Sequence, residues 1–236
     1  MAQKQIHLPG IGQVNLQKRR GARSIRITVG HDGAIRVSLP AWSPYKAGEA
    51  FVLSKRDWIQ QQQAGKSKHV FKPNERVGKA HRVRFIFENR TAITSRVTNT
   101  ELIIRLPLDM EPTDPRVQIA VYAAAVRALK QEAKNLLPRR LSTLANQHGF
   151  SYRSVSVKRL KSRWGSCSSQ KDIALNCFLM QLPWELIDYV LLHELLHTRV
   201  MAHGKAFWAE LDRYVADLPR KRKAIKTYQP ALVAQD

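Results

Sequence analysis

The segment His193-Glu194-Leu195-Leu196-His197, followed by His203, decides how this chain of 236 residues is interpreted. A helix advances 3.6 residues per turn, so His193 and His197 lie one above the other on a single helix face and can share one metal ion. Glu194 lies beside the first ligand, where it can take a proton from a metal-bound water. The pattern predicts a catalytic zinc site with His193, His197 and His203 as ligands.

The residues before this motif favour the helix that it requires. Pro183 lies at or near the first helical position, and Glu185 and Asp188 place acidic side chains in the first turns. Apolar residues that recur at helical spacing are expected in the core: Trp184, Ile187, Leu191 and Leu195. A buried helix with two incidental histidines is the alternative, but a third histidine shortly afterwards makes a chance match rarer.

Composition indicates a folded protein with reduced thiols. Hydrophobic residues make up 44% of the chain, enough for one substantial domain or two small ones. The two cysteines, Cys167 and Cys177, form no Cys-x-x-Cys pair, which leaves the histidines as the metal site. No signal-peptide or membrane-span pattern occurs, so we expect a soluble, cytoplasmic protein without a membrane partner.

The chain is strongly basic, with 40 Lys and Arg against 18 Asp and Glu and a net charge of +22. Such a surface can attract phosphates or acidic proteins, or it can simply be solvated. No recognisable nucleic-acid-binding module accompanies the charge. The basic clusters are Lys18 to Arg26, Arg139-Arg140, Lys158 to Arg163 and Arg220 to Lys223.

Hydrophobic periodicity changes along the chain. Segments 24–29 and 35–39 alternate around the turn sequence His31-Asp32-Gly33 and predict a β-hairpin, whereas 47–63 is predicted to be helical. Further strands are expected at 82–87, 101–106, 154–157 and 173–179. A long helix is expected after a Pro-rich boundary at 107–115, and a last helix at about 205–218. The long helix would have Thr113 or Asp114 as its N-cap, a kink or end at Pro138, and its terminator at Gly149.

The stretch Lys-Ser-Arg-Trp-Gly-Ser-Cys-Ser-Ser at 161–169, together with His-Glu-x-x-His-x5-His, resembles the YgjP-like metallopeptidases, relatives of the SprT-type zincins. Segments 23–27, 55–59 and 187–190 and Phe207-Trp208 extend the resemblance over most of 23–228. The resemblance implies that His193, His197 and His203 are zinc ligands and that Glu194 is the catalytic acid/base. Metzincins have a glycine in the five-residue gap before their third histidine, where this chain has Val200. We therefore expect a different turn, with the helix fraying near Met201.

The resemblance also implies a place for the substrate. In zincins an edge strand beside the cleft can pair with an extended peptide, and segment 173–179 is expected to be that strand. Arg163, Trp164, Gly165, Ser166 and Asn176 are the candidate substrate-binding residues, with Cys167 at the same cleft rim. Trp164 is explained equally well as a core residue.

The expected reaction is hydrolysis of peptide bonds in a protein or peptide substrate by one Zn²⁺ per chain. Glu194 would accept a proton from the zinc-bound water as hydroxide attacks the carbonyl, then pass it to the leaving amine. Tyr189, Tyr214 and Arg213 are the candidates for stabilising the oxyanion. Two alternatives are a DNA-associated protease recruited by its basic surface and a non-catalytic, zinc-stabilised protein that binds nucleic acid. The oligomeric state stays open.

The expected fold is α+β, with a small β-sheet packed on helices that include the His-Glu-x-x-His helix, preceded by a β-rich region. We expect an N-terminal segment at 1–22, a β-rich part at 23–110, a zincin-like metallopeptidase part at 111–228 and a tail at 229–236.

Overall fold

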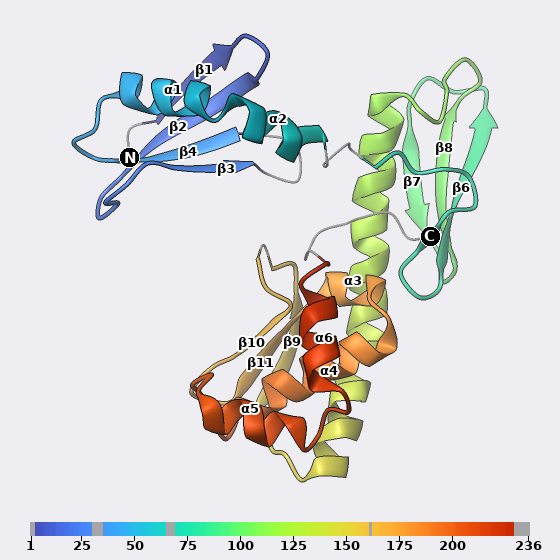
Figure 1. Cartoon of the computed structure of the whole chain (residues 1–236). Helices are drawn as coiled ribbons and strands as arrows, with labels where there is room; N and C mark the ends of the chain where they lie inside the picture. The colour runs from blue at the N-terminus through green and yellow to red at the C-terminus, as the bar shows by residue number, and fades with distance from the viewer. Residues whose placement is uncertain (1–2, 30–34, 65–68, 161, 229–236) are drawn as a thin grey trace. The chain divides into compact units, whose positions relative to one another are not determined.

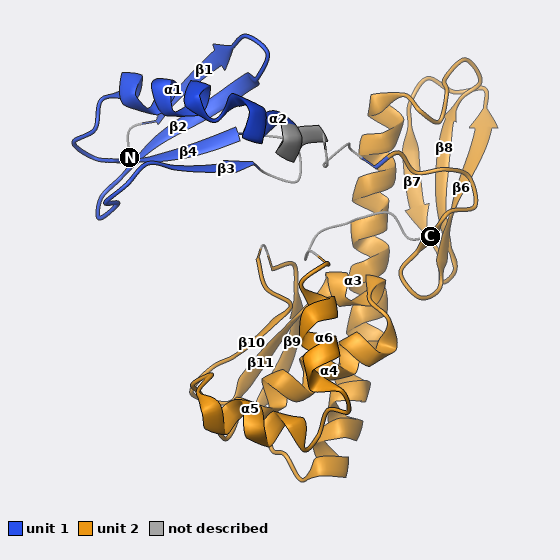
Figure 2. Cartoon of the chain, viewed as in Figure 1, with its two compact units in different colours: residues 1–69 blue, residues 70–236 orange. Residues whose placement is uncertain are grey.

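The computed structural model describes residues 3–29, 35–64, 69–160 and 162–228. The chain forms two compact units, residues 1–69 and 70–236 (Figure 2). Both units combine small sheets with helices, which confirms the α+β fold class. The compact units divide between His69 and Val70. The division of the chain into functional parts at 110 and 111 stays a prediction.

The first unit is a four-stranded sheet with two helices. Its strands are β1 (Gln3–Leu8), β2 (Gly12–Arg19), β3 (Arg26–Val29) and β4 (Ile35–Pro40), in the order β1-β2-β4-β3. The antiparallel pairing of β3 with β4 was expected; the predicted turn at His31 to Gly33 lies outside the described residues. The predicted helix at 47–63 is two helices, α1 (Tyr45–Ser54) and α2 (Arg56–Ala64), because Lys55 leaves helical geometry at φ −111° and ψ 20°.

The second unit begins with another four-stranded sheet, ordered β5-β6-β8-β7. The strands are β5 (Arg76–Val77), β6 (His81–Glu88), β7 (Thr94–Val97) and β8 (Glu101–Pro107), and the predicted strands at 82–87 and 101–106 pair in parallel. Helix α3 (Pro115–His148) packs against this sheet. Asp114 is its N-cap, since its carboxylate accepts a hydrogen bond from the Arg116 backbone N–H at 2.7 Å. Gly149 ends it with a left-handed φ of 67°, and the helix continues through Pro138.

The remaining elements carry the histidines. Strands β9 (Ser154–Lys158), β10 (Gly165–Cys167) and β11 (Asp172–Asn176) form a sheet in the order β10-β11-β9. The 3-10 helix η1 (Cys177–Gln181) leads to α4 (Trp184–Leu196), and α5 (Lys205–Asp212) and α6 (Leu218–Ile225) follow (Figure 1).

The predicted edge strand at 173–179 is therefore wrong on two counts. β11 is the central strand, and residues 177–179 are in a 3-10 turn. The last predicted helix is also shorter than expected, and α6 was missed.

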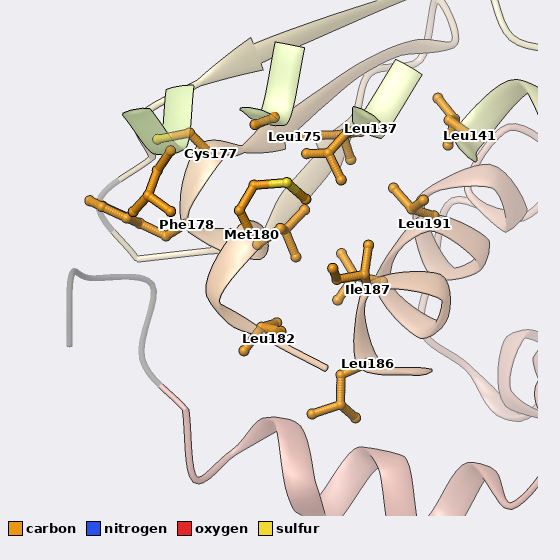
Figure 3. Packing of buried hydrophobic residues seen from close by; sticks show 14 of the residues in the cluster. Leu137, Leu141, Leu175, Cys177, Phe178, Met180, Leu182, Leu186, Ile187 and Leu191 are labelled. Carbon is orange, nitrogen blue, oxygen red and sulfur yellow. The ribbon is translucent and has the colours of Figure 1, made fainter. Parts of the chain in front are cut away.

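Buried side chains hold α4 against α3. Leu137 and Leu141 of α3 pack near Met180 of η1 and Ile187 and Leu191 of α4, in one hydrophobic cluster (Figure 3). Leu195 is buried as expected, but the placement of Trp184 in the core is wrong, since it is 42% exposed. The Lys79 ammonium lies 5.3 Å from the ring centroid of Trp184. This packing fixes the axis of α4 and, with it, the position of the histidines.

No helix in the described part of the chain is long and apolar enough to cross a membrane.

Candidate active site

Three imidazoles meet where α4 ends. His193 lies in the last turn of α4, His197 caps its C-terminus, and His203 precedes α5. The Nε2 atoms of His193 and His197 are 3.2 Å apart, those of His197 and His203 are 3.0 Å apart, and those of His203 and His193 are 2.9 Å apart. Helical spacing explains the first pair. The third histidine arrives through the turn that follows.

That turn is made without a left-handed residue. Helix α4 ends at Leu196, whose carbonyl accepts hydrogen bonds from the N–H groups of Arg199 and Val200, both at 2.9 Å. The Thr198 hydroxyl donates to the Leu195 carbonyl at 2.7 Å. Positive φ angles occur at none of residues 197–204, so Val200 fits where metzincins have glycine. The expected fraying near Met201 is wrong, because the helix already ends five residues earlier.

The chemistry of the three nitrogens fits a metal ion. The Nδ1 atom of His197 lies 3.1 Å from the Val200 carbonyl oxygen, which only accepts hydrogen bonds. Nδ1 therefore carries the proton, and the lone pair of Nε2 faces the other two histidines. A tetrahedral zinc with bonds of about 2.0–2.1 Å holds its nitrogen ligands about 3.3–3.4 Å apart, close to the observed separations.

Protonation also favours a metal site. Burial, and then the neighbouring His197 and His203, lower the pKa of His193 to about 3. Burial likewise lowers the pKa of His197. Neutral imidazoles are the form that binds metals. His193 and His197 are therefore in the ligand form at neutral pH.

Glu194 is buried beside the cluster, at 5% exposed, and its carboxylate packs against Gly165 of β10. Burial raises the pKa of Glu194 to about 8, and the positive charge of Arg163 opposes that rise. A Cβ atom at position 165 would lie only 2.6 Å from Oε1 of Glu194. Gly165 thus leaves the space that the carboxylate fills.

A cavity of about 510 Å³ opens at these residues. Four of the five residues predicted to bind substrate line it together with the motif: Arg163, Trp164, Gly165 and Ser166. Trp164 also packs partly against the hydrophobic core, as its core interpretation requires, and its role in substrate binding stays a prediction. Cys167, a free thiol, lines the cavity as well.

The structure places Asn176 elsewhere. Its side chain is fully buried, and its Nδ2 donates to the carbonyls of Leu160 and Arg163, both at 2.9 Å. Its Oδ1 accepts from the Phe178 backbone N–H at 3.2 Å. Asn176 therefore holds the segment that carries Arg163 and does not reach the cavity, contrary to the sequence-based expectation.

Of the three residues considered for the oxyanion, Tyr189 lines the cavity. The Tyr214 hydroxyl donates to Glu210 at 2.7 Å, and its ring lies edge-on against Phe150. Arg213 pairs with Glu210 at 3.0 Å. Tyr214 and Arg213 are thus engaged outside the residues that line the cavity.

Sequence reasoning missed the aromatic support of His203. Trp208 stacks on the His203 ring with centroids 5.7 Å apart and donates from Nε1 to the His203 carbonyl at 3.1 Å. The Arg222 guanidinium from α6 lies 3.6 Å from the Trp208 ring centroid. The Phe207 ring lies 4.7–4.9 Å from all three imidazole rings. The run Arg220 to Lys223 signalled only surface charge, because α6 was not predicted.

Similarity to a known protein family, rather than to any solved structure, assigns the chain to its family. No curated protein matches the chain. Among solved structures, the metallopeptidase zymogen abylysin of Pyrococcus abyssi is 24% identical, with 39% of this chain and 93% of that chain covered and a TM-score of 0.35. The metallopeptidase zymogen jannalysin of Methanocaldococcus jannaschii is 26% identical, with 40% and 93% covered and a TM-score of 0.32. The family description "YgjP-like, metallopeptidase domain" matches residues 23–228, so the chain belongs to the YgjP-like metallopeptidase family.

Proposed function

We propose that this metallopeptidase is a zinc enzyme that hydrolyses peptide bonds, with one zinc per chain. His193, His197 and His203 would hold the metal, and Glu194 would be the general base. The observation that carries the proposal is the meeting of three Nε2 atoms within 3.2 Å of one another in a cavity that the Glu194 carboxylate also lines. Three protein ligands leave a position open for water or substrate, as in catalytic zinc sites.

The chain's own groups account for the proton transfers. When bound, zinc supplies Lewis acidity, which polarises a carbonyl and lowers the pKa of a water molecule. Glu194 accepts a proton from the attacking water as the new C–O bond forms, and delivers it to the amine nitrogen as the C–N bond breaks. In the absence of a metal ion, burial raises the pKa of Glu194 to about 8. A divalent cation nearby would favour the ionised carboxylate and so lower this pKa. Tyr189 is the candidate donor to the oxyanion.

The peptide would lie along β10 rather than β11. β10 is one of the two edge strands of its sheet, and its residues Gly165, Ser166 and Cys167 all line the cavity. An edge strand offers unpaired backbone N–H and C=O groups to an extended peptide. Main-chain pairing of this kind would bring a peptide to the metal site with little sequence preference.

A Glu194→Gln variant tests the assignment. We expect about one zinc per chain by elemental analysis but a 10²- to 10⁴-fold lower kcat/KM on an unfolded protein substrate, roughly the contribution of a general base. Glu111→Gln is the matched control, because Glu111 is exposed and lies outside the residues that line the cavity. Wild-type turnover by Glu194→Gln with zinc bound would remove Glu194 from the mechanism.

A further inference from the structure

One face of the first unit's sheet is left open by the described helices and strands of that unit. Helices α1 and α2 lie on the other face (Figure 1), where Gly48 of α1 approaches Leu16 and Leu39 and the buried Val52 and Ile59 join the same cluster. Side chains alternate along each strand, so the neighbours of these apolar residues point the opposite way. No described element of the first unit covers that opposite face.

The opposite face carries polar side chains in two rows that cross all four strands. The strand registers define the first row as Gln3, Gln17, Ser38 and Arg26. They define the second row as Gln5, Asn15, Arg36 and Thr28. We call these two rows the amide–arginine face. It contains no apolar side chain, and none of the residues in β1 to β4 is acidic.

Several side chains of this face are free to form hydrogen bonds, as judged within the described part of the chain, whereas Arg36 and Gln17 are already engaged. The side chains of Gln3, Gln5 and Asn15 form no hydrogen bond within the described part of the chain. Arg26 and the exposed Arg23, just before β3, have no acidic partner there either. Among the described residues, the side chain of Arg19, at the end of β2, donates only to Gln17, at 3.4 Å. Residues 1–69 contain 12 Lys and Arg and only three acids, Asp32, Glu49 and Asp57.

The composition of the face decides the kind of partner. Protein interfaces place aromatic or aliphatic anchors at their centre, and membrane-binding surfaces insert apolar side chains, but this face has neither. Guanidinium and amide groups without carboxylates match phosphate oxygens and base edges. We propose that the amide–arginine face binds nucleic acid, chiefly through the phosphodiester backbone. This binding site goes beyond the peptidase reaction and is independent of the histidine cluster.

Fluorescence anisotropy with the zinc-loaded full chain tests the proposal. The probes are a labelled 20-base-pair DNA duplex, an RNA duplex of the same sequence and the single DNA strand, each titrated at several KCl concentrations between 50 and 300 mM. We expect binding to at least one probe. The triple variant R19Q/R23Q/R26Q should bind that probe about tenfold or more weakly. The slope of its log binding constant against log KCl concentration should become shallower by about 1 per arginine. Comparison of the affinities for the three probes identifies which nucleic acid is bound.

A matched control removes three exposed cations from α3, in K130Q/K134Q/R139Q. It should bind almost as tightly as the wild type.

A second test variant, Q5E/N15D, keeps side-chain size and places two carboxylates on the face, so it should also weaken binding at least tenfold. Thermal unfolding checks that each variant is folded, and peptide cleavage should be unchanged in all three, which separates this proposal from the proposed function. The proposal would be overturned if no probe bound at 50 mM KCl, or if R19Q/R23Q/R26Q and K130Q/K134Q/R139Q lost affinity equally. It would also be overturned if Q5E/N15D bound as tightly as the wild type, or if polyglutamate bound as tightly as the nucleic acid.

Discussion

Replacing Gly165 by alanine would displace the Glu194 carboxylate without removing any metal ligand. A Cβ atom at this position would lie 2.6 Å from Oε1, 2.7 Å from Cγ and 2.8 Å from Cδ of Glu194. The backbone of Gly165 is held by its pairing with Leu175 of the central strand. The side chain of Glu194 therefore moves, not the strand.

The size of the effect follows from that displacement. Ordinary van der Waals contact begins at about 3.4 Å, so Oε1 must shift by roughly 0.8 Å from its 2.6 Å position. A misplacement of about 1 Å in a reacting group can cost about 10²-fold in rate, or about 2.7 kcal/mol of transition-state stabilisation. We therefore expect kcat/KM of Gly165→Ala to fall about 10²-fold while zinc stays near one per chain.

Cleavage of a fluorogenic peptide and elemental analysis of the same sample measure the two quantities. Gly204→Ala is the matched control, because a Cβ atom there has no neighbour within 4 Å. It should keep near-wild-type cleavage although it adjoins His203. Near-wild-type kcat/KM for Gly165→Ala would refute the steric account. A loss of zinc in parallel with activity would show instead that the substitution damages the metal site.

Two further predictions concern a third ligand and a buried ion pair. His203→Ala should lower zinc occupancy well below one per chain and abolish cleavage; near-native values of both would remove His203 from the ligand set. Both ring nitrogens of the buried His81 face acceptors, since Nδ1 lies 2.5 Å from Glu132 and Nε2 lies 2.9 Å from the Thr98 carbonyl. Burial alone lowers the pKa of His81 and raises that of Glu132, but their hydrogen bond reverses both directions. The stabilisation is therefore complete between the usual values of 4.5 for Glu132 and 6.5 for His81. It is lost as pH rises through the raised pKa of His81 or falls through the lowered pKa of Glu132. Glu132→Gln should lower the free energy of unfolding by about 3–5 kcal/mol near pH 5.5 and by less at pH 9, measured by urea denaturation at each pH. An equal loss at both pH values would contradict the ion pair.

The sequence predicted those elements whose packing produces a regular pattern. Helix α3 has apolar residues on one face and an Asp-Pro start with a glycine stop, so its bounds followed from residues 113–115 and 149. Strand β1 was missed because Ile6 and Leu8 are its only apolar residues, and its place in the sheet depends on pairing with β2. Long-range pairing leaves little trace in local periodicity. The same reason explains why β11 was taken for an edge strand.

The candidate site was predictable where one helix supplies it. His193, Glu194 and His197 depend on helical spacing alone, whereas the placement of His203 depends on a turn and on stacking against Trp208. The contact between Trp208 of α5 and Arg222 of α6 could not be predicted, because it forms through tertiary packing. Periodicity does not encode such contacts.

Asn176 shows how a residue outside the cavity can still govern the site. Its amide joins the carbonyls of Leu160 and Arg163, and its backbone N–H donates to the Trp164 carbonyl at 2.8 Å. These three bonds fix the chain immediately before Gly165, whose missing side chain sets the position of Glu194. A buried amide that satisfies backbone groups in this way is costly to remove, since the carbonyls would lose their partners. The Arg-Trp-Gly segment and Asn176 therefore act as one support for the Glu194 carboxylate, and the structure gives Asn176 a positioning role rather than a place in the cavity.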